Sequence, residues 1–246
     1  MRVNLSIVLP AYKEKENLAI LIPQIETEFQ DASFEIIVVD DHSCDGTREL
    51  IDGLNQTYHN IILIERSGLL GIGSALRDGY DRADGEYILS SDSDLSFSVQ
   101  DMRALYEKIC TGFDVVLGYK IYKSTKDQKK TIKVWCETFL FSLISNVIIS
   151  VISGIGLKNY NTNFRIIRAS MWDSILTVEN RQFFLFETIF RAKQKGAKIA
   201  EIPVTFHLRK FGESKVSFFR QAPKYFVRLV LLVFFDRPSK IKIPKG

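Results

Sequence analysis

Cysteine and histidine are scarce in this chain of 246 residues, which contains three of each. Cys44, Cys110 and Cys136 are odd in number and form no CxxC pair, so we expect a reducing compartment in which they serve as small hydrophobic residues. The N-terminus has too short an apolar run for a signal peptide, and no internal repeat or low-complexity tract is present. A chain of this length can bury a core without disulfides, as one domain or as one domain with an appendage.

Apolar runs and amphipathic segments alternate along the first half of the chain. Strands are predicted at residues 6–9, 34–41, 61–65, 86–90 and 114–117, and helices at 16–28, 45–55, 74–83 and 99–111. In FEIIVVDD the four apolar residues Ile36–Val39 lie between charged residues, which is typical of a strand buried on both faces. The alternation predicts an α/β fold with a mainly parallel sheet and helices on both faces.

Five polar or glycine-bearing segments each follow a predicted strand. Because ligands of parallel sheets bind beyond the carboxyl ends of the strands, we expect the five to converge on one edge. They are Pro10–Glu14, Asp40–Asp41, Ser67–Gly73, Asp92–Asp94 and Gly118–Lys120.

Two of these carboxylates, Asp92 and Asp94, are separated by one residue at a predicted strand end. Carboxylates at this spacing can share one hard cation such as Mg²⁺ or Mn²⁺, which prefers oxygen ligands and accepts phosphate oxygens in the rest of its shell. A DxD sequence alone often occurs by chance on a protein surface, but its place at the end of a buried strand favours a metal site.

Two other strand ends are candidates for nucleotide contacts. Asp40 and Asp41 could accept hydrogen bonds from a base or ribose, although capping of the helix predicted from Asp45 is the alternative. The glycine-bearing turn Ser67–Gly73 does not complete a GxGxxG fingerprint, because Leu76 stands at the third glycine position. This argues against a nicotinamide-binding Rossmann site.

Lysine and arginine are concentrated in two segments. Residues 118–133 have a net charge of +5 and residues 207–246 a net charge of +8, which leaves −9 on the rest of the chain. Such segments attract phosphates, anionic lipid or nucleic acid; a solvated surface is the alternative.

Two apolar segments of the second half are candidates for membrane contact. Residues 138–157 contain no charge and are long enough to span a bilayer. Their serines and Asn146, however, form a polar stripe along one face of a helix. A membrane span would also place the polar motifs before and after it on opposite sides of the bilayer. We therefore predict a helix at about 134–155 that lies on a membrane surface or packs on the domain. Residues 225–235 are too short to span a bilayer and are flanked by basic residues, which favours an interfacial helix over a core helix. The predicted boundaries are a catalytic domain over 1–215 and a basic, amphipathic membrane-associating segment over 216–246.

Six motifs between Leu5 and Lys215 match the pattern of one family. PAYKEKENL (10–18) resembles PxYNExENL, IIVVDDHSCDGT (36–47) resembles VVDDGSxDGT, residues 66–75 resemble RxxxxGxGxA, and SDSDLS (91–96, with Ser90 before it) resembles DADLS. NYNTNFR (159–165) resembles DxTSGFR, and EIPVTFHLRKFGESK (201–215) resembles EIPVxFxxRxxGxSK. The chain thus resembles the family 2 glycosyltransferases with a GT-A fold, in the branch of dolichyl-phosphate mannose synthases and bacterial polyprenyl-phosphate hexosyltransferases.

The resemblance implies an inverting transfer of a hexose, mannose or glucose, from a nucleotide diphosphate sugar to a polyprenyl phosphate. Mg²⁺ or Mn²⁺ would stabilise the diphosphate leaving group, and the anionic acceptor would need no strong base. The donor would be GDP-mannose or UDP-glucose, with no nucleic-acid partner. The protein would be peripheral at the cytoplasmic face of a membrane, bound by surface helices or by a membrane-protein partner.

The resemblance also implies roles for individual residues. Donor-binding positions are Pro10, Tyr12, Glu14, Val39, Asp40, Asp41, Gly71, Gly73 and Asp92. Asp92 and Asp94 would hold the metal and diphosphate, Lys120 would meet the acceptor phosphate, and Arg165 would help there or brace the site. Further phosphate contacts would come from Lys133, Arg209, Ser214 and Lys215, with Lys129 and Lys130 as alternatives to Lys133.

Several positions depart from the family pattern. Lys120 replaces an arginine with a point charge, and Ser96 stands where some relatives have a metal-ligating glutamine. Asn159, Asn161 and Asn163 replace Asp, Thr and Gly of DxTSGFR; at position 163 asparagine can still adopt a positive φ.

Two alternatives to this function remain open. One is a related transferase whose acceptor is a saccharide or lipid-linked saccharide, and the other is a non-catalytic protein that binds sugar nucleotides.

Overall fold

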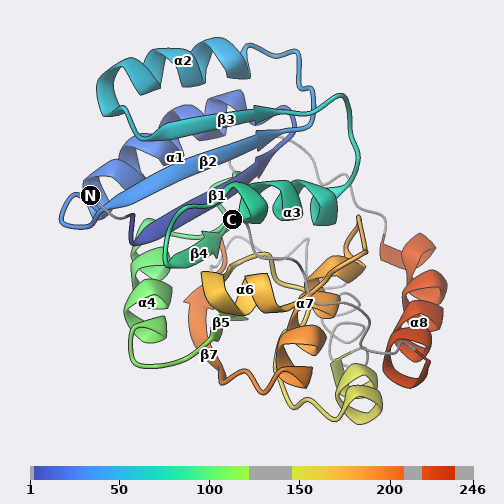
Figure 1. Cartoon of the computed structure of the whole chain (residues 1–246). Helices are drawn as coiled ribbons and strands as arrows, with labels where there is room; N and C mark the ends of the chain where they lie inside the picture. Colours follow the sequence, from blue (N-terminus) through green and yellow to red (C-terminus); the bar gives the residue numbers. More distant parts are fainter. Residues whose placement is uncertain (1–2, 122–145, 208–217, 236–246) are drawn as a thin grey trace, which may run out of the picture.

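The computed structural model describes residues 3–121, 146–207 and 218–235, arranged as in Figure 1. The strands are β1 (Leu5–Ala11), β2 (Phe34–Asp40), β3 (Ile61–Glu65), β4 (Tyr87–Ser90), β5 (Val115–Ile121), β6 (Arg165–Arg168) and β7 (Ile199–Thr205). The helices are α1 (Lys15–Glu28), α2 (Thr47–Tyr58), α3 (Ile72–Arg82), α4 (Val99–Ile109), α6 (Ala169–Ser174), α7 (Phe183–Gln194) and α8 (Phe218–Phe234), and a further short helix covers 146–153.

The seven strands form one sheet in the order β3-β2-β1-β4-β6-β5-β7. Strand β6 is antiparallel to both of its neighbours, and the other pairings are parallel. The prediction of a mainly parallel α/β sheet is therefore confirmed. All the strands and helices predicted in the first half of the chain are present, with ends shifted by a few residues.

Hydrophobic residues cover both faces of the sheet. Leu5, Ile7 and Leu9 of β1 pack into a cluster with α1 and α4, whereas Val8 points into a second cluster with α3 and α7. Burial on both faces explains why the central strands are continuous apolar runs rather than alternating ones. A third cluster joins α7, α8 and the 146–153 helix around Phe186.

Two expectations about local structure were wrong. Strand β5 continues to Ile121, so Gly118–Lys120 lie inside this strand rather than after it. Cys44 and Cys110 are exposed thiols and not packed hydrophobic residues. A third prediction, the helix at about 134–155, is tested only over its described part, which is helical over 146–153.

No helix in the described ranges is both long enough and apolar enough to cross a bilayer. Helix α8 instead packs on α7 through Leu229 and Leu232, while Leu231 and Phe234 on the same helix are exposed.

Candidate active site

Three of the predicted strand-end segments meet at one edge of the sheet. The N–H of Asp41 donates to the carbonyl of Ala11 at 2.9 Å, and the N–H of Ser91 donates to the carbonyl of Val8 at 3.3 Å. The hydroxyl of Ser93 donates to the carbonyl of Pro10 at 2.9 Å. The ends of β1, β2 and β4 are thus tied to one another by hydrogen bonds, as the parallel topology requires.

The Asp92–Asp94 turn is held in a defined shape. Asp94 is 3% exposed, and its Oδ1 accepts the N–H of Ser96 at 3.0 Å. Leu95 between them has a positive φ of 61°, which is unusual for a residue with a side chain and marks a constrained turn. The turn ends where Ser98 caps α4 by accepting the N–H of Asp101.

Asp92 is held from a different part of the chain. Its Oδ1 accepts a hydrogen bond from the side-chain amide of Asn163 at 3.2 Å. Asn163 lies in the pre-β6 loop, residues 158–164, and is 4% exposed. It is not among the described residues with a positive φ, so it does not use the left-handed conformation open to asparagine, and it contributes here through its side chain.

Two further oxygen atoms of this site are buried without a hydrogen-bond partner among the residues that the structure describes. They are Oγ of Ser96 and Oδ1 of Asn163. Like the carboxylates of Asp92 and Asp94, both are hard oxygen donors of the kind that Mg²⁺ and Mn²⁺ select. Nowhere in the described ranges do three His, Cys, Asp or Glu side chains gather, so neutral oxygens and a ligand's phosphates would have to complete the shell. The residues present fit such a cation.

Asp40 and Asp41 have different environments although they are adjacent. Asp40 accepts hydrogen bonds from the backbone and the hydroxyl of Ser43, and this hydroxyl accepts the N–H of Lys13 at 2.8 Å. Asp40 therefore shapes the loop after β2 and joins it to the loop after β1. It does not cap α2, whose N-cap is Gly46 without a side-chain cap. Asp41 faces Arg66.

The pair of Asp41 and Arg66 is almost fully buried, with side chains 6% and 4% exposed. Burial raises the pKa of the Asp41 carboxyl, and the charge of Arg66 opposes this effect. Arg66 also donates to Ser74 Oγ in α3. Arg66 begins the RxxxxGxGxA motif, but no role was predicted for it; its position directly after β3 was the available signal.

The glycines of the turn before α3 allow close packing. Gly71 has a φ of +104°, and a Cβ there would lie 2.5 Å from the carbonyl oxygen of Asn180. A Cβ at Gly73 would lie 2.5 Å from the Cβ of Phe184. Both glycines thus let the α6–α7 loop, residues 175–182, close against α3, and their contact with a donor remains a prediction.

The remaining donor-binding candidates differ in exposure. The side chain of Val39 is completely buried in the core, so only its backbone could face a ligand. Pro10, Tyr12 and Glu14 are partly exposed at the end of β1, and Glu14 accepts a hydrogen bond from Asn17 at 2.6 Å.

The two predicted catalytic cations have contrasting positions. The ammonium of Lys120 lies 3.8 Å from the ring centroid of Phe206, a cation–π contact at the end of β5. Arg165 is 1% exposed and donates to the backbone carbonyls of Thr162 and Leu185. Burial lowers the pKa of Arg165 to about 10, so it keeps its charge at neutral pH. Its contacts correspond to the bracing role, because they tie the pre-β6 loop to α7.

Lys133, Arg209, Ser214 and Lys215 lie outside the described residues. The described chain after β7 ends at His207, whose N–H donates to the Ser96 carbonyl at 2.9 Å.

The family of this chain follows from comparison with known proteins. The model of glycosyl transferase family 2 matches residues 6–176, well over half of the sequence. The chain belongs to glycosyl transferase family 2. The predicted resemblance is confirmed at this level.

Several known proteins are similar in sequence to most of this chain. A dolichol-phosphate mannosyltransferase of Pyrococcus furiosus is 30% identical over 87% of this chain and 59% of its own length. A polyprenol monophosphomannose synthase of Mycolicibacterium smegmatis is 25% identical over 86% of this chain and 80% of its own length. An undecaprenyl-phosphate 4-deoxy-4-formamido-L-arabinose transferase of Salmonella choleraesuis is 30% identical over 87% of this chain and 63% of its own length. The chain thus spans about three fifths of the length of two of these relatives.

Solved structures of the same fold include a glucosyl-3-phosphoglycerate synthase from Mycobacterium tuberculosis, in complex with Mn²⁺, UDP and phosphoglyceric acid. It superposes with a TM-score of 0.69 over 93% of this chain and 78% of its own, at 15% identity. A complex of the same enzyme with Mg²⁺ and UDP has a TM-score of 0.65, at 15% identity over 93% of this chain and 79% of its own. The GT-A fold predicted for this family 2 member is therefore confirmed.

Proposed function

We propose that this family 2 member transfers a hexose from a nucleotide diphosphate sugar to a polyprenyl phosphate. The observation that supports this most is that oxygens of Asp92, Asp94, Ser96 and Asn163 and the Asp41–Arg66 pair lie near strand ends that hydrogen bonds tie together. Such a site suits a cation and a diphosphate next to a nucleoside. The acceptor class comes from the relatives, each of which is named for a dolichol, polyprenol or undecaprenyl phosphate.

In the proposed reaction an oxygen of the acceptor phosphate attacks the anomeric carbon while its bond to the donor diphosphate breaks, with inversion. The acceptor monoester is anionic at neutral pH, so the site needs no strong base. Asp92 and Asp94 would hold Mg²⁺ or Mn²⁺, which when bound offsets the charge that develops on the leaving group. Lys120 would attract the acceptor phosphate, while Arg165 braces the loop that positions Asn163.

We further propose that the protein acts at the cytoplasmic face of a membrane. Two neighbouring helices, α8 and the 146–153 helix, expose large apolar side chains while their other faces pack in one cluster. We call these exposed residues the outer apolar surface: Val147, Ile148, Val151, Phe226, Val227, Leu231, Phe234 and Phe235. Interfacial helices with basic residues nearby bind lipid by the same combination of apolar burial and charge. A membrane-protein partner could cover the same surface.

The test is release of nucleoside diphosphate from a panel of nucleotide sugars that includes GDP-mannose and UDP-glucose. Each donor is incubated with purified protein and Mn²⁺ or Mg²⁺, with a polyprenyl phosphate, with a saccharide acceptor, or with neither. We expect release from one donor only with the lipid phosphate, and the Asp94→Asn variant should lose the metal-dependent part. Release that requires the saccharide would establish the other acceptor class. Binding of nucleotide without any turnover would instead indicate a non-catalytic sugar-nucleotide-binding protein.

A further inference from the structure

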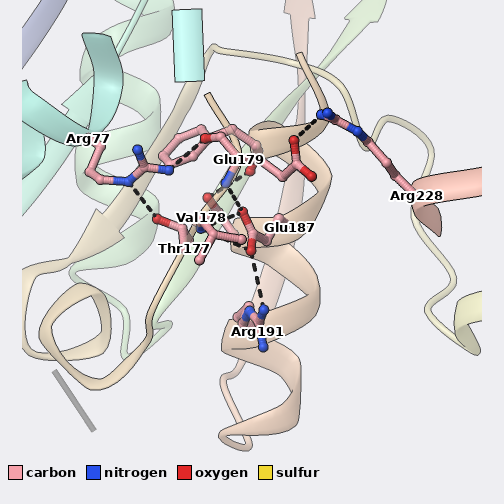
Figure 2. Close-up of polar contacts among 9 residues, drawn as sticks. Arg77, Thr177, Val178, Glu179, Glu187, Arg191 and Arg228 are labelled. Carbon is pink, nitrogen blue, oxygen red and sulfur yellow. Dashed lines mark hydrogen bonds and ion pairs between the residues drawn. The ribbon is translucent and has the colours of Figure 1, made fainter. Parts of the chain in front are cut away.

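The α6–α7 loop lies between α3 and α7 and is held on both sides by hydrogen bonds (Figure 2). From α3, the guanidinium of Arg77 donates to the carbonyl of Glu179 at 2.6 Å and to Asn180 Oδ1 at 2.9 Å. From α7, the fully buried carboxylate of Glu187 accepts the backbone N–H groups of Val178 and Glu179, at 3.1 and 2.9 Å. This number of contacts leaves the loop little freedom to move by itself.

The position of this loop sets the position of the predicted donor turn. The N–H of Ser74 donates to the carbonyl of Asn180 at 3.1 Å, and Gly71 packs against the same carbonyl. The hydroxyl of Ser74 in turn accepts a hydrogen bond from Arg66, the buried partner of Asp41. A displacement of the α6–α7 loop would therefore reach the nucleoside end of the site.

Helix α8 contacts this loop through a charged pair. Arg228 forms an ion pair with Glu179, and Figure 2 shows it approaching the loop from the side opposite Arg77. Arg228 is about half exposed, whereas the carboxylate of Glu179 is largely covered. Burial raises the pKa of Glu179, and the charge of Arg228 opposes this. The ion pair thus provides a counter-charge for a carboxylate on the loop.

Helix α8 also holds the pre-β6 loop. The hydroxyl of Tyr225 donates to Oδ1 of Asn161 at 2.7 Å, and the ring of Tyr225 packs edge-on against Phe183 at 4.8 Å between centroids. Asn161 lies two residues before Asn163, which donates to Asp92. One turn of α8 therefore contacts both loops. Tyr225 contacts the pre-β6 loop, which reaches Asp92, and Arg228 contacts the α6–α7 loop, which reaches the donor turn.

We propose that α8 is a positioning element for the nucleotide site, in which Tyr225 holds the pre-β6 loop against Asp92 and Arg228 holds the α6–α7 loop against the donor turn. The inference rests on the proposed function for the ligand, a nucleoside diphosphate with its cation, and its link to lipid rests on the proposed membrane contact. Because the outer apolar surface includes the opposite face of α8, seating this helix on lipid and ordering the donor site become linked properties.

The experiment measures binding of UDP and of GDP with Mn²⁺ by calorimetry, without lipid, together with the thermal midpoint of each variant. We expect Tyr225→Phe to weaken binding about three- to tenfold, as loss of one buried hydrogen bond predicts, and Arg228→Glu to weaken it about two- to fivefold. The matched control is Val227→Ser on the exposed face of the same helix, which should leave affinity unchanged. The double variant Glu179→Arg with Arg228→Glu should recover affinity, a rescue that general destabilisation would not produce.

Wild-type affinity in both folded single variants would overturn the inference, as would failure of the charge-swapped pair to recover affinity. If Tyr225→Phe does not fold, the Glu179 and Arg228 variants decide the matter alone. Absence of nucleotide binding by the wild-type protein would overturn the proposed function and, with it, this inference. Because that result appears in the wild type and not in the variants, the two failures can be told apart.

Discussion

The side-chain amide of Asn163 donates a hydrogen bond to Asp92, with Nδ2 and Oδ1 3.2 Å apart. This contact joins the loop before β6 to the turn after β4, 71 residues away in the chain. It leaves Oδ1 of Asn163 buried without a partner among the described residues. A buried amide oxygen beside two carboxylates is suited to a cation or a ligand hydroxyl, because an unsatisfied acceptor is costly.

Replacing Asn163 by alanine should therefore weaken metal binding. The substitution removes both the hydrogen bond that orients Asp92 and the additional oxygen, and loss of such an orienting partner typically costs about tenfold or more in metal affinity. Paramagnetic titration with Mn²⁺ in the presence of a nucleoside diphosphate measures the change. Asn4→Ala, at an exposed position, is the control and should have no effect. Equal Mn²⁺ affinity in wild type and Asn163→Ala would contradict this role.

Gly73→Ala should destabilise the fold and disturb the donor turn. Its Cβ would lie 2.5 Å from the Cβ of Phe184 and 2.7 Å from the Arg181 carbonyl oxygen, and relief of such an overlap costs about 1–3 kcal/mol. Gly53→Ala in α2 is the matched control, because a Cβ there meets nothing within 4 Å. It should stabilise the protein by about 0.5–1 kcal/mol. Chemical denaturation of both variants measures the difference, and a neutral Gly73→Ala would show that the α6–α7 loop can move away.

Nucleoside binding should weaken on acidification at a higher pH than an ordinary aspartate would give. Burial raises the pKa of Asp41 above its usual 3.8, so this carboxylate takes up a proton earlier and can no longer accept hydrogen bonds on both oxygens. The same shift means that proton uptake by Asp41 stabilises the fold below pH 3.8, and that this contribution is lost as pH rises through the raised value.

The affinity for uridine or guanosine, measured between pH 4 and 7 without metal, should decrease as Asp41 takes up its proton. Working without phosphates and cation keeps Asp92 and Asp94 out of the measurement. We expect Asp41→Asn to abolish this pH dependence of nucleoside affinity. If the variant keeps the same pH dependence, another group is responsible for it.

The double variant Leu231→Ser with Phe234→Ser should reduce binding to anionic vesicles by about tenfold. Both side chains are more than half exposed on α8, and burial of large apolar side chains provides most of the affinity of an interfacial helix. Vesicle sedimentation at moderate salt measures the loss, and moderate salt should leave wild-type binding largely intact. Leu69→Ser, at an exposed apolar residue after β3, is the control. Equal sedimentation of all three proteins would exclude the outer apolar surface as the lipid contact.

Much of the fold and part of the site could be predicted from local sequence. Continuous apolar runs such as that of β2 reflect burial on both faces, a property that each strand shows by itself. The parallel order then requires the ends of neighbouring strands to meet, so Pro10, Asp41 and Asp92 could be placed at one edge without coordinates. Strand β6 was not predicted, because two isoleucines between two arginines contain too little periodicity to identify a strand.

The sequence by itself thus determined the alternation of strands and helices, the edge where the carboxylates gather, and the motifs of family 2. Only the tertiary structure decided which of those polar groups bond to other groups of the protein. Asp40 is engaged by Ser43, Arg165 by backbone carbonyls, and Asp41 by Arg66. It also decided that Asn163 reaches Asp92 and that Tyr225 reaches Asn161. Local periodicity reports which face of an element is buried, whereas the partner of a polar side chain depends on contacts between segments far apart in the chain.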